Sequence, residues 1–232
     1  MINTEGRNEL IELAEFVDLT HTALILVDMQ RDFIEPDGVD GELGIDLSMC
    51  AELRPRLAAL LASAHLSGAL VVHLQQAALP GRMSDSPAQI SFNVRMHEEA
   101  HRDGAPLCHT VPGTPGHEFT QDFTPLPNEL VVHKYRSTGF WGTNLDMLLR
   151  SNGIETVVVG GYATGDCVES TARDAMFNDY HVIVPEDCIP RDDEANHEAW
   201  VLLMRHRFDV ATVEEIQHVW ENQTARETEE SR

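Results

Sequence analysis

The only lysine of the 232-residue chain, Lys134, stands at the end of a short apolar run, residues 130–133. Because 15 arginines serve the other strongly basic positions, a solitary lysine there indicates a chemical role. Asp28 closes a second apolar run, and Cys167 follows a third after a glycine-containing turn. The three runs therefore end in an amine, an acid and a thiol. These groups are suited to balancing charge, transferring a proton and acting as a nucleophile.

The elements that must position these residues follow from the spacing of apolar residues. Runs rich in Val, Ile and Leu alternate with segments of helical period, which is typical of a parallel sheet covered on both faces. The sequence thus predicts an α/β fold, a doubly wound parallel sheet flanked by helices in a Rossmann-like three-layer sandwich. We expect strands near 22–28, 69–74, 129–133, 156–161, 181–185 and 209–213, and helices near 48–66, 142–152, 166–179 and 193–206.

The carboxyl ends of parallel strands share one edge of the sheet, where ligands bind. Asp28, Lys134 and Cys167 all fall at such ends, so we expect them to converge. Cys167 also lies in the first turn of the helix predicted over 166–179. A thiol at a helix N-terminus beside an ammonium is expected to have a lowered pKa, which would make Cys167 a nucleophile. Taken singly, each residue has an ordinary structural explanation as a cap, a solvated lysine or a core cysteine.

The length of the chain suits one large domain, which we place at residues 21–220. A polar leader, residues 1–20, precedes it, and a polar tail, residues 221–232, is expected to be frayed. The proline-rich stretch 76–128 interrupts the alternation of strands and helices. Long excursions of this kind serve as lids or as oligomer contacts, and the sequence does not separate these roles.

A formal net charge of −23 excludes the usual electrostatic partners. Such a chain repels a nucleic-acid backbone and an anionic membrane, so small molecules are the expected ligands. The apolar runs are too short to span a bilayer, and residues 1–7 lack the pattern of a secretory signal, so a cytoplasmic location is expected. The four cysteines are far apart without a Cys-x-x-Cys spacing, which argues against a zinc knuckle and a disulfide framework.

Three segments of the chain resemble a known family. These are residues 23–33 (Ala-Leu-Ile-Leu-Val-Asp-Met-Gln-Arg-Asp-Phe), residues 133–145, which begin His-Lys-Tyr-Arg, and residues 160–175, which contain Tyr-Ala-Thr-Gly-Asp-Cys-Val-Glu-Ser. In this order they resemble the isochorismatase-like cysteine hydrolases, which include nicotinamidases, N-carbamoylsarcosine amidohydrolases, ureidoacrylate amidohydrolases and biuret hydrolases. The resemblance covers roughly residues 20 to 215.

The resemblance implies a role for each reactive residue. Asp28 would be the general base and acid, Lys134 its electrostatic partner and Cys167 the nucleophile. A cis peptide bond between Tyr162 and Ala163 would direct the N–H groups of Ala163 and Cys167 into an oxyanion hole. The resemblance also implies a homodimer or homotetramer.

We therefore expect a cysteine-dependent amidohydrolase that cleaves a small carbamoyl or ureido compound through a thioester. True isochorismatases lack the nucleophilic cysteine, so Cys167 favours C–N hydrolysis. Two alternatives stay open, a nicotinamidase-type hydrolase and a catalytically inactive binding scaffold of the same fold. Nicotinamidases of the family carry a metal held by an Asp and histidines after the second strand. Residues 72–79 lack an Asp-x-His element, so no metal or other cofactor is expected, and His73 is interpreted as a packed histidine.

A competing motif, His97-Glu98-Glu99-Ala100-His101, matches the His-Glu-x-x-His pattern of zinc proteases. The third histidine of the longer motif would fall at residue 107, which is Leu, so a zinc protease is disfavoured.

Several residues near the proposed centre are candidates for binding the substrate. Aromatic side chains would wall a small pocket, although aromatic residues near strand ends more often belong to the core, and an arginine would bind a substrate carboxylate in a bidentate contact. The candidates are Phe33, Arg136, Phe140, Trp141 and Tyr162. Arg95 is a weaker candidate, because a surface ion pair with a nearby acid is the favoured explanation for it.

Overall fold

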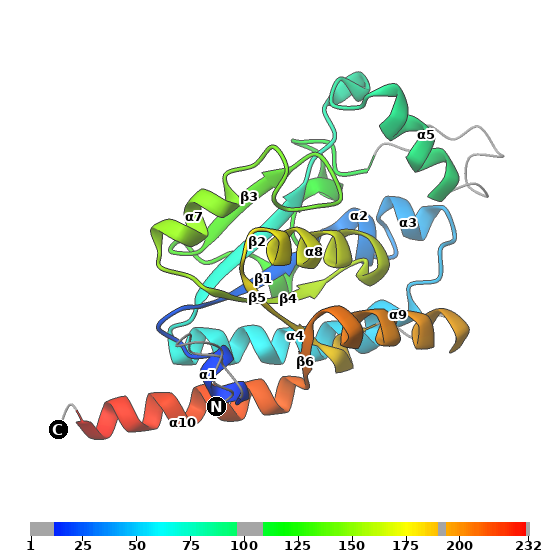
Figure 1. Ribbon diagram of the computed structural model, residues 1–232. Coiled ribbons are helices and arrows are strands. Elements are labelled where there is room, and N and C mark those ends of the chain that lie inside the picture. Colours follow the sequence, from blue (N-terminus) through cyan, green and yellow to red (C-terminus); the bar gives the residue numbers. More distant parts are fainter. Residues whose placement is uncertain (1–11, 97–108, 190–193, 231–232) are drawn as a thin grey trace.

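The computed structural model of the protein describes residues 12–96, 109–189 and 194–230 (Figure 1). Its centre is one parallel sheet of six strands in the order β3-β2-β1-β4-β5-β6. The chain moves outward from β1 to β3, then returns to the other side of β1 with β4. Ligands of such sheets bind at this reversal, beyond the carboxyl ends of β1 and β4. The strands are β1 (Thr22–Val27), β2 (Leu70–Gln76), β3 (Leu130–Lys134), β4 (Thr156–Gly161), β5 (His181–Pro185) and β6 (Asp209–Ala211).

Helices connect the strands and cover both faces of the sheet. The α-helices are α1 (Leu13–Phe16), α2 (Arg31–Ile34), α3 (Val39–Glu42), α4 (Ser48–Ser67), α5 (Pro87–Met96), α7 (Leu145–Ser151), α8 (Glu169–Phe177), α9 (Glu194–Arg207) and α10 (Val213–Glu230). Short 3-10 helices are η1 (Pro80–Arg82), η2 (Pro115–His117), η3 (Gln121–Phe123) and η5 (Glu186–Cys188), and η4 (Thr164–Val168) is a π-helical turn. None of the helices in the described ranges combines the length and the hydropathy needed to cross a membrane.

The core consists of two layers, one on each face of the sheet. Alternate residues of β1 point to opposite faces, so Leu24 and Leu26 pack with α4 and α10, whereas Ile25 and Val27 pack with α7, α8 and α9. All six residues of β1 are buried, as expected for the central strand of a sheet covered on both sides. Figure 1 shows α4 and α10 side by side beneath the sheet, with α7 and α8 across it.

The predicted fold class is confirmed, and every predicted strand is present within two residues of its expected bounds. The expectation for residues 76–128 needs refinement, because this stretch contains η1, α5, η2 and η3. Helix α5 lies away from the layers of the sandwich, beyond the carboxyl ends of the strands (Figure 1).

The expectation of a frayed tail is wrong for residues 221–230, which continue helix α10. Helix α10 begins directly after β6, and its apolar side is anchored by Ile216 and Trp220, which are fully buried. The indole N–H of Trp220 donates to the carbonyl of Val17 at 2.9 Å, and Leu19 N–H donates to the side chain of Gln223 at 3.1 Å. The end of the polar leader is therefore attached to α10. The polar composition of residues 221–232 did not indicate a helix, because α10 is apolar on one side only.

Replacing Trp220 by Ala should lower the free energy of unfolding by about 3–5 kcal/mol, because it empties a buried site and orphans the Val17 carbonyl. Urea denaturation would measure this change. Trp141 is the matched control, since it is 66% exposed, and Trp141→Ala should cost about 1 kcal/mol or less. Equal losses in the two variants would contradict the assigned role of α10.

Candidate active site

The sheet register brings Lys134 and Asp28 to the same edge. Lys134 is the last residue of β3 and pairs with Gln76 of β2. Asp28 follows the last residue of β1, and its N–H donates to Leu74 of β2 at 3.1 Å. Its backbone has a φ of 53°, in the left-handed region that Asp tolerates better than most residues. This conformation ends the strand and turns the chain away from the ladder.

Lys134 is fully buried, and its ammonium is surrounded by acceptors. Its Nζ lies 2.7 Å from Asp28 Oδ2 and 3.3 Å from Cys167 Sγ. It also donates to Gln76 Oε1 at 2.8 Å and to the Arg136 carbonyl at 3.1 Å. A buried charge needs an opposite charge and a full set of hydrogen bonds, and this site supplies both. The predicted convergence of Asp28, Lys134 and Cys167 is therefore present in the structure.

Cys167 is positioned by an unusual turn after β4. The Tyr162–Ala163 peptide bond is cis, as the family resemblance implied, and residues 164–168 form a π-helical turn ahead of α8. Such turns are rare and frequently occur at functional sites. Gly161 has a φ of 139°, and a Cβ there would lie 2.2 Å from the carbonyl oxygen of Val27. Only glycine lets β4 approach β1 this closely while the chain turns.

Gly165 is required because of a neighbouring helix. A Cβ on this residue would lie 2.2 Å from the ring of Trp200 on α9. The glycine therefore allows the cysteine-bearing turn to pack directly against α9.

The predicted oxyanion hole consists of the N–H groups of Ala163 and Cys167. The carbonyl of Ala163 accepts hydrogen bonds from Asp166 and Val168, so it is held inside the turn. In the described part of the chain, the N–H of Ala163 donates to no backbone carbonyl. This donor is consistent with the expected hole.

The charges at the centre alter one another's pKa values. Burial raises the pKa of Asp28 above its ordinary value of 3.8, and the Lys134 ammonium only partly opposes this effect. Burial acts to lower the pKa of Lys134, but the charges of Asp28 and Cys167 prevail and raise it. In the described residues, no donor reaches either Asp28 oxygen with the geometry of a hydrogen bond, although Lys134 Nζ lies 2.7 Å from Oδ2 in an ion pair. Asp28 thus retains capacity to accept a proton.

The expectation of a lowered pKa for Cys167 is wrong. Burial raises the pKa of its thiol well above the ordinary value of 9.0, and the carboxylates of Asp28 and Asp166 add to the rise, while Lys134 opposes it. Cys167 is half-buried as a residue because one side faces a cavity, but the packing around its thiol removes most of its hydration. Cys167 is therefore a neutral thiol at rest, and it would have to lose its proton before it could act as a nucleophile.

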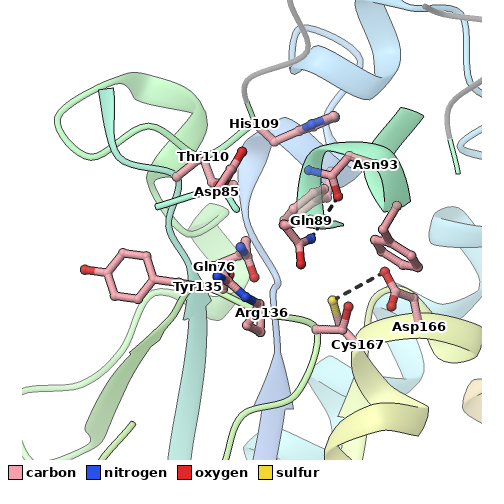
Figure 2. A pocket seen from close by; sticks show the side chains of 14 residues that line it. Gln76, Asp85, Gln89, Asn93, His109, Thr110, Tyr135, Arg136, Asp166 and Cys167 are labelled. Atoms are coloured by element: carbon pink, nitrogen blue, oxygen red, sulfur yellow. Dashed lines mark hydrogen bonds between the residues drawn. The ribbon is translucent and has the colours of Figure 1, made fainter. Parts of the chain in front are cut away.

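A cavity of about 110 Å³ opens above Cys167 (Figure 2). Its floor comes from the strand ends, and Gln89, Phe92 and Asn93 of α5 form part of its wall. Its remaining lining residues are Phe33, Gln76, Ala78, Asp85, His109, Thr110, Tyr135, Arg136, Ser137, Asp166 and Cys167. Most of the polar residues of this lining were not predicted from the sequence, because they lie in the irregular stretch 76–128. Asp166 and Gln76 were missed although they neighbour predicted residues.

Two of the five predicted substrate-binding residues, Phe33 and Arg136, line the cavity. The other three lie outside its lining. Phe140 is buried in the core and packs against Tyr180, with ring centroids 5.9 Å apart. Trp141 is 66% exposed beneath the guanidinium of Arg136. Tyr162 packs on the outer side of Phe33, with its hydroxyl 3.5 Å from Asp40. Aromatic residues beside a strand end are therefore a poor guide to the pocket wall.

The residues considered for a metal lie apart from this centre. His73 is fully buried within β2 and pairs with Glu129 at 3.1 Å, as the packed interpretation expects. Among the described residues, no group of three His, Cys, Asp or Glu side chains is arranged to hold a metal ion. The motif His97–His101 lies outside the described residues. Arg95 is an exposed residue of α5 and does not line the cavity.

Comparison with known proteins places these features in a family. Residues 22–215 match the model of the isochorismatase domain. The chain belongs to the isochorismatase family. It is 32% identical over 179 residues to the ureidoacrylate amidohydrolase RutB of Caulobacter vibrioides, covering 74% of this chain and 77% of that protein.

Solved structures of the isochorismatase family share the architecture. A cysteine hydrolase from Pseudomonas syringae pv. phaseolicola superposes with a TM-score of 0.73 at 23% identity, covering 89% of this chain and 95% of that one, and it shows the fold alone. The N-carbamoylsarcosine amidase of Thermoplasma acidophilum has a TM-score of 0.64 at 28% identity, covering 83% and 96% of the two chains.

Replacing Lys134 by Met should lower the free energy of unfolding by about 3–5 kcal/mol at neutral pH, because it leaves Asp28 buried without its counter-ion. The double variant Asp28→Asn, Lys134→Met should lose much less than the sum of the two single variants. Urea denaturation of all four proteins measures the coupling.

The exposed pair Arg150–Asp146, with a distance of 2.9 Å, is the matched control. Arg150→Met should cost about 1 kcal/mol or less. Additive losses at Asp28 and Lys134 would show that the two charges do not support each other.

Proposed function

We propose that the chain is a cysteine-dependent amidohydrolase that cleaves the C–N bond of a small carbamoyl or ureido compound. The observation that carries this proposal is the position of Lys134 Nζ, 2.7 Å from the Asp28 carboxylate and 3.3 Å from the Cys167 thiol, together with the cavity that Cys167 lines. A base, a cation and a nucleophile are the parts that acyl transfer requires. The similarity to ureidoacrylate amidohydrolases supports the substrate class.

In the first step, Asp28 takes the proton of the Cys167 thiol, and Sγ attacks the carbonyl carbon of the substrate. The negative charge moves from the Asp28 carboxylate to sulfur and then to the carbonyl oxygen, while Lys134 remains beside both partners. The N–H groups of Ala163 and Cys167 are the donors assigned to the developing oxyanion. Fixed donors stabilise that charge without having to reorient.

In the second step, the tetrahedral intermediate collapses and the C–N bond breaks. Asp28 returns its proton to the leaving nitrogen, which departs as ammonia or an amine, and the acyl group stays on Cys167 as a thioester. Water then loses a proton to Asp28 and attacks the thioester carbon, which releases the acid and restores the thiol. With a ureido substrate, the acid released is a carbamate.

The cavity supports a small substrate with an anionic group. Its volume of about 110 Å³ suits a small molecule. Arg136 lines it, and the contacts of the guanidinium within the described residues are the carbonyls of Ser84 and Tyr135 and the ring of Trp141. This cation is held in place by neutral groups, so its charge is available to a substrate carboxylate. Arg136 is thus the residue assigned to the carboxylate of a ureido acid.

Ammonia release from a panel of N-carbamoyl amino acids, ureidoacrylate, biuret, maleamate and nicotinamide tests this proposal. The enzyme should turn over at least one carbamoyl or ureido compound, and Cys167→Ala should abolish that turnover because it removes the nucleophile. A chelator should leave the rate unchanged. Activity that survives Cys167→Ala would contradict the thioester mechanism. Turnover of nicotinamide alone, lost with the chelator, would favour the nicotinamidase alternative.

The acid side of the pH profile of kcat/KM should report Asp28. The reaction needs its carboxylate, and burial raises its pKa above 3.8. As the pH falls, the carboxyl group is therefore protonated earlier than an exposed Asp, and activity should decline with a midpoint above pH 3.8. Assays at neutral pH after acid incubation control for unfolding. A midpoint at or below the ordinary value would contradict the role of Asp28 as base.

A further inference from the structure

Asp166 is a second carboxylate at the centre, which the mechanism does not use. It immediately precedes Cys167 in the π-helical turn, and its Oδ2 lies 3.9 Å from Cys167 Sγ. Its side chain lines the cavity, and Figure 2 shows the carboxylate beside the sulfur atom. In the described part of the chain, no basic side chain forms an ion pair with it.

This carboxylate does not help Cys167 react. Its negative charge raises the pKa of both the Cys167 thiol and Asp28, so it opposes formation of the thiolate. A negative charge that hinders the nucleophile and is not compensated by a partner in the described residues needs another function. The neighbouring carboxylate Asp85 differs in this respect, because it is paired with Arg82 at 3.3 Å.

The position of Asp166 relative to the sulfur limits what it can contact. When Sγ bonds to the substrate carbonyl carbon, that carbon carries the oxygen, the leaving nitrogen and one retained group. An atom of the retained group that is bonded directly to the carbon is two bonds from Sγ, within reach of a carboxylate 3.9 Å from the same sulfur. A carboxylate can only accept hydrogen bonds. The retained group that satisfies it is therefore an N–H donor, and an anionic group there would be repelled.

We propose that Asp166 is a specificity-determining residue that accepts a hydrogen bond from the retained NH2 of a carbamoyl group, so that the enzyme selects carbamoyl over alkyl acyl groups. This inference rests on the proposed function. With Arg136 at another part of the wall, the cavity has a positive and a negative side. A ureido acid matches both, with its carboxylate at Arg136 and its terminal NH2 at Asp166.

A pair of isosteric substrates tests the hydrogen bond. N-carbamoylglycine and N-acetylglycine release the same amine, glycine, and differ by NH2 against CH3 in the retained group. The wild-type enzyme should prefer the carbamoyl compound in kcat/KM by roughly 10- to 100-fold, which is the usual value of a hydrogen bond to a charged group. Asp166→Leu should abolish this preference, and Asp166→Asn, whose oxygen still accepts a hydrogen bond, should restore part of it. A preference unchanged in Asp166→Leu would overturn the proposal.

A second measurement does not depend on knowing the substrate. The thiol of Cys167 is modified with methanethiosulfonates that are cationic (aminoethyl), neutral (methyl) or anionic (sulfonatoethyl), and mass spectrometry identifies the modified residue. Each rate is expressed relative to that of the neutral reagent. The cationic reagent should react faster than the anionic one, and Asp166→Asn should reduce the ratio of the cationic to the anionic rate about tenfold. Glu169→Gln is the matched control, because it removes the same charge three residues further along the chain. Glu169 is paired with Arg173 on helix α8 and does not line the cavity.

The two measurements separate the possible failures. If neither glycine derivative is turned over by the wild-type enzyme but the charge ratio falls in Asp166→Asn, the proposed substrate class is wrong, and Asp166 still selects against an anionic group beside Cys167. If the ratio is the same in the wild type, Asp166→Asn and Glu169→Gln, then Asp166 does not act on the reacting thiol and the inference is overturned, whatever the substrate.

Discussion

The burial of the Lys134 ammonium is the constraint on which the site depends. A fully buried cation is tolerated only where a carboxylate and several acceptors are fixed around it. Here the partners come from the ends of neighbouring elements, Asp28 after β1, Gln76 from β2 and Cys167 from the turn after β4. None of these partners is near Lys134 in the sequence. The strand order and register must be correct before the ammonium can be buried, so the same interaction ties the fold to the chemistry.

The balance of charge around Lys134 also explains why Cys167, the proposed nucleophile, rests as a neutral thiol. One ammonium compensates one carboxylate, and a thiolate beside them would add a second negative charge in a desolvated place. In the proposed mechanism, transfer of the thiol proton to Asp28 avoids this cost, because the total charge stays constant and only moves from oxygen to sulfur. A nucleophile of this kind is formed when substrate is present to receive the charge. Between turnovers the cysteine remains neutral, and neutral thiols are the less reactive form toward oxidants.

The sequence predicts the sheet and the convergence of its three reactive residues because both depend on local patterns. A run as short and as rich in Val as Thr156–Gly161 is typical of a buried strand, and the carboxyl ends of parallel strands share an edge by geometry. The pKa of Cys167 was predicted with the wrong sign because burial depends on everything packed around the thiol, which position in a helix does not reveal. Phe140 was misplaced for a related reason, since an aromatic side chain beside a turn packs equally well into the core or a pocket. Helix α10 was not predicted because its buried face has few residues.

The wall of the cavity, which the sequence could not predict, is built differently from the centre around Lys134. The strands and the turn after β4 supply Asp28, Lys134 and Cys167, the proposed proton acceptor, cation and nucleophile, and a shift in any of them would disturb the partners of a buried charge. Helix α5 and the residues around it supply much of the cavity wall from a stretch outside the sandwich, where the backbone is not fixed by the sheet. In the proposed function, the chemistry therefore depends on the most constrained residues and the choice of substrate on less constrained ones. Asp166 is the exception. It lies in the constrained turn itself, next to Cys167. A substitution of Asp166 that changed the proposed acyl specificity would therefore have to preserve the position of Cys167, whereas a substitution in α5 would not be limited in this way.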